Sequence, residues 1–192
     1  LVGAGLDDVI QIISRSLLSP GDEIIVADPT FSQYELHAVI EGAKVVKVPV
    51  KQSSGEMDLE AMLEAITAKT KIIWLCNPNN PTGTYLPQSL IRAFIEKVPT
   101  DVLVISDEAY QEYVTDEAIS TSLPLLETLS NIIVMRTFSK AYGLAGLRIG
   151  YAIIPTTVSR AFDIVRPPFN TSTIAQKAAI VALEDQAFIE HS

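Results

Sequence analysis

Short apolar runs alternate with longer segments of helical period along the chain. Residues 24–26 and 102–105 consist of Ile, Val and Leu alone, a pattern typical of strands that are buried on both faces of a sheet. Six strands are predicted from such runs, over residues 23–27, 44–48, 71–75, 102–106, 132–136 and 149–153. Helices are predicted where apolar residues recur every three or four positions, around residues 9–17, 59–66, 90–95 and 174–182.

The order of these elements predicts the fold class. Strands that alternate with helices favour a mostly parallel central sheet with helices on both faces, which is a three-layer α/β/α sandwich. The 192 residues suit one domain, and no internal repeat, low-complexity tract or linker divides them. We therefore expect an α/β protein built around one sheet.

Charge and cysteine content limit the classes of protein to which this chain can belong. The chain has 14 Lys and Arg against 23 Asp and Glu, a net charge of −9, which disfavours binding to nucleic acid or to an acidic membrane surface. No run reaches the roughly 18 apolar residues of a membrane span, so we expect a soluble protein. The lone Cys76 cannot form an internal disulfide and no secretory signal pattern opens the chain, which favours a cytoplasmic location. Neither His37 nor His191 forms a ligand pair with Cys76, so no metal site is expected.

One segment gathers side chains that suit a phosphorylated ligand. Residues 137–148 lie between two predicted strands and contain Thr137, Ser139, Lys140 and Arg148. Hydroxyls and a guanidinium beside the free N–H groups that follow a strand form a site for a phosphate dianion. A neighbouring cation also favours the neutral, nucleophilic form of a lysine amine. Taken alone, Lys140 would be interpreted as an ordinary solvated lysine. The hydroxyls and the guanidinium around it indicate instead that it takes part in a reaction.

Two further segments follow the carboxyl ends of buried strands, where open α/β sheets place their ligand crevice. Residues 77–83 read Asn-Pro-Asn-Asn-Pro-Thr-Gly, and residues 107–110 read Asp-Glu-Ala-Tyr. A buried carboxylate such as Asp107 is costly unless a cation meets it, which indicates a cationic partner. Each segment also has a plain structural explanation, because Asn-Pro steps form turns and an Asp caps helices.

A glycine turn opens the chain. Residues 3–5 read Gly-Ala-Gly, and Leu6 and Asp7 then lead into a predicted helix. Backbone N–H groups at the positive end of a helix attract an anion. An ordinary helix cap explains the same residues, and the turn lacks the third spaced glycine of a dinucleotide-binding fingerprint. Because Leu6 has an apolar side chain, any polar contact there must come from its backbone.

Three motifs occur together in one order along the chain. They are Asn-Pro-Thr-Gly at residues 80–83, Asp-Glu-Ala-Tyr at residues 107–110, and Ser139-Lys140 with Arg148 eight residues further on. In this combination the chain resembles the large domain of the fold-type I aminotransferases, which depend on pyridoxal 5'-phosphate. The sequence around the motifs is most similar to the histidinol-phosphate aminotransferases, and the resemblance covers essentially the whole chain.

The resemblance implies catalytic roles for three residues. Lys140 matches the lysine that binds the cofactor covalently and later moves the substrate proton, so it is both nucleophile and general base. Asp107 matches the carboxylate that pairs with the pyridine nitrogen of the cofactor. Tyr110, together with Asn80, matches the pair of groups that hydrogen-bond the phenolic oxygen.

The remaining cofactor contacts are implied in the same way. Thr137, Ser139 and Arg148 match positions that hold the phosphate, and the glycine turn with Leu6 and Asp7 matches backbone that meets it. Phe31 matches an aromatic residue that stacks on the cofactor ring, although it would also suit the protein core at a helix start. Asn170, after a rigid break at residues 166–169, is a further candidate near the site.

These implications predict an enzyme that transfers an amino group from a small-molecule amino donor to a 2-oxo acid. The expected pair is histidinol phosphate with 2-oxoglutarate, a step of histidine biosynthesis. An aromatic or broad-specificity aminotransferase and a decarboxylase of a phosphorylated amino acid stay open, because the identified residues touch the cofactor and not the substrate. A cofactor-sensing domain of a transcription regulator is the non-enzymatic alternative.

The resemblance also implies an assembly and a domain boundary. Members of the family work as homodimers, so a homodimer is expected. Residues 1–192 are expected to be an incomplete cofactor-binding large domain, without the N-terminal arm, the strand that leads into the glycine turn, and the C-terminal small domain.

Overall fold

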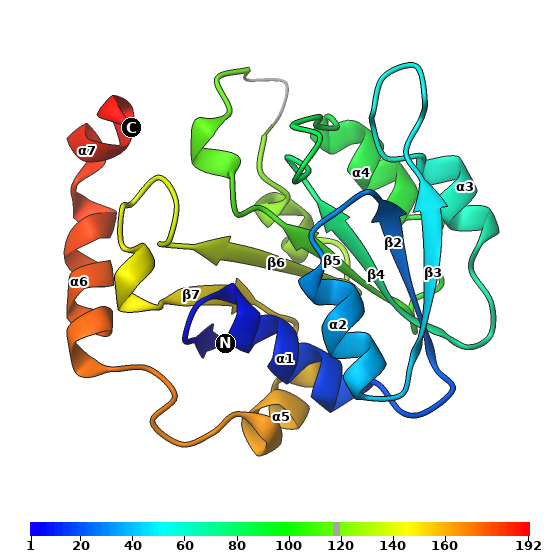
Figure 1. Ribbon diagram of the computed structural model, residues 1–192, viewed down its shortest axis with the longest axis horizontal. Helices are drawn as coiled ribbons and strands as arrows, with labels where there is room; N and C mark the ends of the chain where they lie inside the picture. Colours follow the sequence, from blue (N-terminus) through cyan, green and yellow to red (C-terminus); the bar gives the residue numbers. More distant parts are fainter. Residues whose placement is uncertain (117–119) are drawn as a thin grey trace.

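A seven-stranded sheet forms the centre of the molecule in the computed structural model, which describes residues 1–116 and 120–192 (Figure 1). Its strand order is β1-β7-β6-β5-β4-β2-β3. In chain order the strands are β1 (Val2–Gly3), β2 (Glu23–Asp28), β3 (Lys44–Pro49), β4 (Thr70–Cys76), β5 (Leu103–Asp107), β6 (Ile132–Thr137) and β7 (Gly150–Ile153). All six strands predicted from apolar runs are present, with ends that differ by at most one residue.

The strands from β2 to β6 run parallel to one another, and β7 runs the other way. β2 pairs in parallel with β3 and β4, and β5 joins β4 to β6 in the same direction. β7 is antiparallel to both of its neighbours, β6 and β1. The prediction of a mostly parallel sheet is therefore confirmed.

The first strand corrects one expectation. The resemblance implies that the strand leading into the glycine turn lies outside the chain, but β1 does lead into that turn. Val2 and Gly3 pair with Tyr151 and Gly150 of β7, so the turn is held at the sheet by the two residues before it. A strand of two residues is too short to produce a detectable alternation of polar and apolar positions.

Helices carry most of the connections between strands. They are α1 (Leu6–Leu17), α2 (Gln33–Ile40), α3 (Leu59–Glu64), α4 (Gln88–Ile95), α5 (Thr156–Val165), α6 (Thr173–Glu184) and α7 (Gln186–His191). Short 3-10 helices lie at Gln111–Tyr113, Leu123–Glu127 and Ala145–Leu147. In α1 the acidic Asp7 and Asp8 lie in the first turn and Arg15 in the last, an arrangement that complements the helix dipole.

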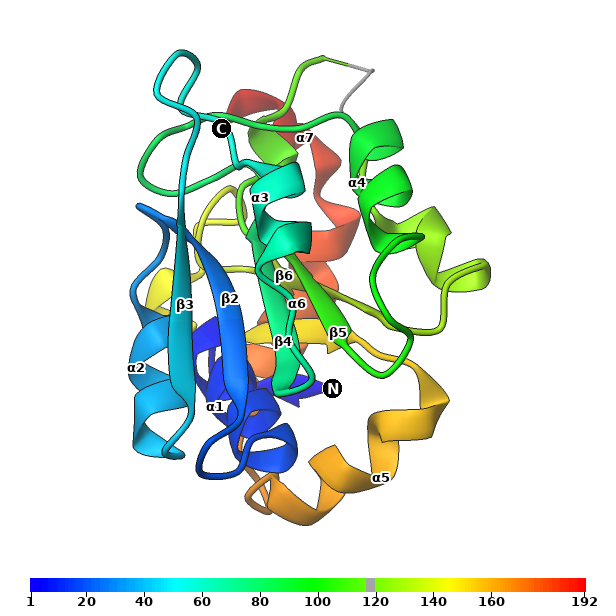
Figure 2. The same cartoon turned by 90° about the vertical axis from the view of Figure 1, so that its right-hand side faces the viewer.

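Two apolar cores separate the helices from the sheet, one on each face. Ile24 and Val26 of β2 belong to the core under α1 and α2, whereas the alternate residues Ile25 and Ala27 belong to the core under α3 and α4. This alternation follows the two-residue period of a strand. Figure 2 shows α2 on one side of β2 and β3, with α3 and α4 on the other side. The predicted three-layer sandwich is confirmed.

The last two helices lie beyond β7 at one end of the molecule, in orange and red at the left of Figure 1. Ala175 and Ala179 of α6 pack there against Phe138 and Ile149 in a third, smaller core. Other residues of α6 remain exposed, including Ile174, Ile180 and Val181. Among the residues that the structure describes, no helix combines the length and the apolar character that crossing a membrane requires.

Candidate functional site

The candidate site lies at the carboxyl ends of β4, β5 and β6. These ends are side by side, because Cys76 pairs with Asp107 and Asp107 pairs with Met135 in the parallel ladders. A cavity of about 270 Å³ opens there. It is lined by Leu6, Asp7, Phe31, Cys76, Asn80, Asp107, Ala109, Tyr110, Thr137, Ser139, Lys140, Ala145 and Arg148. The fold therefore brings to one cavity all ten residues that the resemblance matches to catalytic or cofactor-binding positions.

Asp107 is the buried acid of this cavity, with 2% of its surface exposed. Its Oδ2 accepts a hydrogen bond from the Tyr34 hydroxyl at 2.6 Å, and its Oδ1 accepts one from the backbone N–H of Ala109 at 3.0 Å. Burial raises the pKa of the Asp107 carboxyl to about 6, although both hydrogen bonds and the charge of Lys140 act to lower it. The bond to Ala109 is a local turn contact, so Asp107 is both a turn residue and a buried acid.

Tyr34 on α2 is a site residue that the sequence analysis misses. Its side chain is fully buried, at 0% exposure. The ring stacks on Trp74 with centroids 4.6 Å apart and planes inclined by 10°, and it meets Phe31 in a T-shaped contact at 5.6 Å. Burial raises the pKa of the Tyr34 phenol well above its usual range, so the hydroxyl remains a donor. Nothing in the local sequence marks Tyr34, because only the folded chain brings α2 to the end of β5.

Cys76 lines the cavity and is also absent from the prediction. Its Sγ donates to the carbonyl of Pro78 at 3.4 Å. Burial raises the pKa of the thiol to about 12, so Cys76 stays neutral near physiological pH. The signal that identifies it is its position, since it ends a buried strand in register with Asp107.

The asparagines of the loop after β4 have two different roles. Asn77 donates to the Leu86 carbonyl at 3.0 Å and accepts the Leu86 N–H at 2.7 Å. Asn79 accepts from the Thr30 hydroxyl at 2.8 Å. These two asparagines shape the loop, as the turn interpretation predicts, whereas Asn80 lines the cavity.

Gly5 and Arg148 join the glycine turn to the loop between β6 and β7. A Cβ on Gly5 would lie 2.3 Å from Nη2 of Arg148, and the φ of Gly5 is +83°, so this close approach requires glycine. From its Nη1, Arg148 donates to the Ala145 carbonyl at 3.0 Å and to the Ser139 hydroxyl at 3.4 Å. The guanidinium is thereby held at one end of the cavity.

Backbone amides and hydroxyls complete that end of the cavity. The Val9 N–H bonds to the Gly5 carbonyl at 3.4 Å, so the amides of Leu6 and Asp7 precede the helical ladder of α1. The Leu6 side chain belongs to the core, which leaves only its backbone for a polar contact, as expected. Together with Thr137, Ser139 and Arg148, these amides form an end that is suited to a phosphate.

Lys140 and Tyr110 contact each other across the cavity. The Lys140 Nζ lies 5.4 Å from the centroid of the Tyr110 ring, within the range of a cation–π interaction. Lys140 itself is exposed. Phe31 is half-buried, and it both packs on the core and lines the cavity. Its position therefore suits both roles considered from the sequence, a core residue and a residue that stacks on a cofactor ring.

Glu108 lies next to Asp107 but has different contacts. Its buried carboxylate pairs with Arg136 at 2.8 Å and accepts hydrogen bonds from the Thr121 hydroxyl and the Ser122 N–H. Arg136 also pairs with Glu112 at 2.9 Å. This network ties the segment after β5 to β6 and holds one wall of the site in place.

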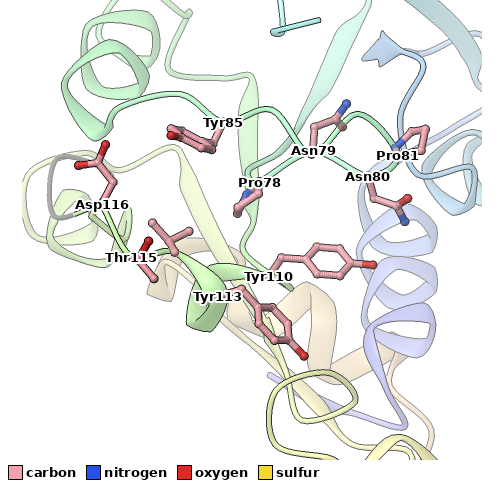
Figure 3. A pocket seen from close by; sticks show the side chains of 11 residues that line it. Pro78, Asn79, Asn80, Pro81, Tyr85, Tyr110, Tyr113, Thr115 and Asp116 are labelled. Carbon is pink, nitrogen blue, oxygen red and sulfur yellow. The ribbon is translucent and has the colours of Figure 1, made fainter. Parts of the chain in front are cut away.

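A second cavity of about 440 Å³ adjoins the first and shares Asn80 and Tyr110 with it. Figure 3 shows these two side chains extending to the same side from two different loops. Tyr85 and Tyr113 also line this second cavity. A molecule bound in the first cavity therefore has an open, aromatic-walled space beside it.

Asn170 is not one of the residues that line either cavity. Its Nδ2 donates to the Asp8 carboxylate at 2.9 Å and to the Val2 carbonyl at 3.0 Å. In the described part of the chain it therefore supports the start of α1.

Comparison with known proteins places the chain in a family. The family model "Aminotransferase class I and II" matches residues 1–192, and the chain belongs to that family. Histidinol-phosphate aminotransferase 1 of Bacillus cereus is 56% identical over 190 residues, which is 99% of this chain and 51% of that protein. Histidinol-phosphate aminotransferase of Halalkalibacterium halodurans is 51% identical over 192 residues, which is 100% of this chain and 52% of the relative.

A solved structure agrees with these relatives. Histidinol-phosphate aminotransferase from Sinorhizobium meliloti, crystallised in complex with pyridoxal 5'-phosphate, superimposes with a TM-score of 0.92 at 34% identity. The match covers 99% of this chain and 51% of that chain. The chain thus spans about half the length of the relatives that it matches.

Proposed function

We propose that the cavity binds pyridoxal 5'-phosphate and that the intact protein is an aminotransferase acting on histidinol phosphate and 2-oxoglutarate. One observation carries the proposal: a buried acid, a lysine and an end rich in N–H groups surround a single cavity. The names of the relatives support it, as does the pyridoxal 5'-phosphate bound to the Sinorhizobium meliloti enzyme.

The donors and acceptors around the cavity fit this cofactor. The hydrogen-bond partners of Asp107, the Tyr34 hydroxyl and the Ala109 N–H, are neutral. A protonated pyridine nitrogen supplies the cationic partner that stabilises a buried carboxylate. At the other end, Gly5 leaves room for the Arg148 guanidinium, and a charge-assisted contact with a phosphate suits that geometry.

The cofactor supplies an aldehyde that amines attack and a ring that accepts electron density. Lys140 would hold the cofactor through Nζ, and the same nitrogen would move the substrate proton. Asp107 keeps the ring nitrogen protonated. Tyr110 and Asn80 would hydrogen-bond the phenolic oxygen, and Phe31 would cover one face of the ring.

Groups of this chain would hold the phosphate at the opposite end. Arg148, Ser139 and Thr137 bind it together with the amides of Leu6 and Asp7, where the helix dipole is positive. The amino donor and the 2-oxo acid then approach in turn through the adjoining cavity, beside Asn80 and Tyr110.

The intact protein is a cytoplasmic homodimer in this proposal. The family resemblance implies a dimer, and the exposed apolar residues of α6 suit burial against a second surface: Ile174 is 71% and Val181 is 64% exposed. The lone cysteine is consistent with a reducing compartment. Sedimentation of the intact protein tests the dimer.

The donor assay tests the function directly. Histidinol phosphate added to the intact, cofactor-loaded protein is expected to abolish the visible absorbance of the bound cofactor, and 2-oxoglutarate is expected to restore it while glutamate forms. The Lys140→Ala variant is expected to lack both the visible absorbance and the conversion, because the covalent attachment is lost. Lys97→Ala, at an exposed lysine remote from the cavity, is the matched control.

Each alternative gives a different result in the same assay. Conversion by aromatic donors alone would indicate an aromatic aminotransferase, and conversion by many unrelated donors would indicate one of broad specificity. Release of carbon dioxide would indicate a decarboxylase. Binding without turnover would favour a sensing domain. An unchanged spectrum in Lys140→Ala would contradict the role assigned to that lysine.

A further inference from the structure

Tyr34 and Asp107 form a buried pair behind the wall of the cavity. Asp107 lines the cavity, whereas Tyr34 does not line it and donates a 2.6 Å hydrogen bond to Asp107 Oδ2 from behind the wall. The second oxygen, Oδ1, is held by the N–H of Ala109. Both oxygens of the carboxylate are therefore oriented by donors from the protein.

The aromatic neighbours of Tyr34 leave its hydroxyl little freedom to move. Trp74 stacks on one face of the ring at 4.6 Å, and Phe31 contacts Tyr34 in a T-shaped arrangement at 5.6 Å. A fully buried tyrosine hydroxyl requires a hydrogen-bond partner, and here the partner is a carboxylate. The stack thus fixes a neutral donor against a buried acid.

We propose that Tyr34 is a positioning residue for the reaction: its hydroxyl orients the Asp107 carboxylate and makes it a weaker base toward the cofactor ring. The inference rests on the proposed function. A carboxylate and a ring nitrogen that share a proton divide it according to their relative basicity. A less basic carboxylate leaves more of the proton on the nitrogen, which keeps the ring an acceptor of electrons.

The other charged and titratable groups around Asp107 do not replace this hydroxyl. Cys76 from β4 is a neutral thiol with a raised pKa, and Glu108 raises the pKa of Asp107. Lys140 lowers that pKa through its charge, but in the proposed reaction its nitrogen is committed to the cofactor and the substrate. Tyr34 is the side chain that can stabilise the carboxylate throughout the reaction.

The test removes only the hydroxyl. Tyr34→Phe keeps an aromatic ring for the contacts with Trp74 and Phe31. In the cofactor-free intact protein, carbon-13 NMR of the Asp107 carboxyl is expected to give a titration midpoint about one pH unit higher than in the unmodified protein. In the cofactor-loaded protein, kcat is expected to fall by about tenfold with little change in KM. Tyr142→Phe, which removes a phenol hydroxyl near Phe138, is the matched control and should leave both readouts unchanged.

A second substitution guards against a variant that fails to fold. 3-Fluorotyrosine at position 34 keeps the ring and the hydroxyl but makes the hydroxyl a stronger donor, so the Asp107 midpoint is expected to move to lower pH. An unchanged midpoint in both proteins would overturn the role of Tyr34. The titration is made without cofactor, so it tests Tyr34 even if the protein binds no pyridoxal 5'-phosphate. A Lys140→Ala variant that behaves like the unmodified protein in the donor assay would count against the proposed function alone.

Discussion

At the residue scale, Asp107 combines two opposing requirements. Burial favours its neutral form, and the pKa of about 6 reflects that cost. The proposed reaction needs the carboxylate, because only a charged partner stabilises a protonated ring nitrogen. Tyr34, Ala109 and Lys140 reduce the free-energy cost of the buried Asp107 carboxylate without removing it. The cofactor-free site therefore favours the binding of a cationic ligand.

Asp107→Asn is expected to keep the cofactor attached to Lys140 but to lower kcat by at least about 100-fold. The amide has nearly the shape of the carboxylate but carries no charge to hold the ring nitrogen protonated. Stopped-flow kinetics with histidinol phosphate would measure the loss. Asp101→Asn, at an exposed position, is the control, and a full rate in Asp107→Asn would contradict the assigned role.

At the scale of elements, the site depends on strand ends and one helix start. Parallel strands place Cys76, Asp107 and Thr137 at the same edge of the sheet, although these residues are far apart along the chain. The turn between β1 and α1 then approaches from the side, and Gly5 lets it contact Arg148. The phosphate end of the site is thus made by two segments that the pairing of β1 with β7 helps to bring together.

Gly5→Ala is expected to weaken pyridoxal 5'-phosphate binding by at least about tenfold. The added Cβ would lie 2.3 Å from Arg148 Nη2, and a φ of +83° is strained for alanine, so the guanidinium or the turn must move. Gly146→Ala is the matched control, since a Cβ there meets nothing within 4 Å. Equal dissociation constants for the two variants, measured by equilibrium dialysis, would contradict this prediction.

At the scale of the whole molecule, a buried acid makes folding depend on pH. The pKa of Asp107 rises from 3.8 to about 6 on folding, so the folded state binds more protons than the unfolded state between these values. Stability from this group is therefore present below about pH 4 and is lost as the pH rises through about 6. The sign is opposite to that of a carboxylate stabilised by a salt bridge.

Urea unfolding of the cofactor-free protein would reveal this dependence. Between pH 4 and pH 7, the free energy of unfolding of the unmodified protein is expected to fall by about 2 kcal/mol relative to that of Asp107→Asn. Comparing the two proteins cancels the contributions of the other acids. Parallel pH profiles would show that Asp107 is not the buried acid described here.

Much of the fold could be predicted from the sequence. Buried strands such as residues 102–105 have no polar positions, and α1 carries an apolar stripe that begins at Val9, so local patterns indicate both kinds of element. The two-residue β1 is too short to leave a pattern. The order of the strands and the reversed direction of β7 depend on pairing between distant segments, which local periodicity does not record.

The chemical candidates were also accessible from the sequence. Asn80, Asp107 and Lys140 lie in motifs that follow predicted strands, and a parallel sheet gathers such ends at one edge, whereas Arg148 directly precedes a predicted strand. Their roles in catalysis remain predictions that the experiments above address.

The sequence by itself determined the composition of the strands and helices and the residue types available for chemistry, because these depend on neighbours along the chain. The tertiary structure alone decided which neighbours each group has in space. Tyr34 meets Asp107, and Gly5 meets Arg148, across 73 and 143 positions of sequence. Such contacts arise from packing α2 and the first turn against the sheet, and they decide how the site is charged and shaped.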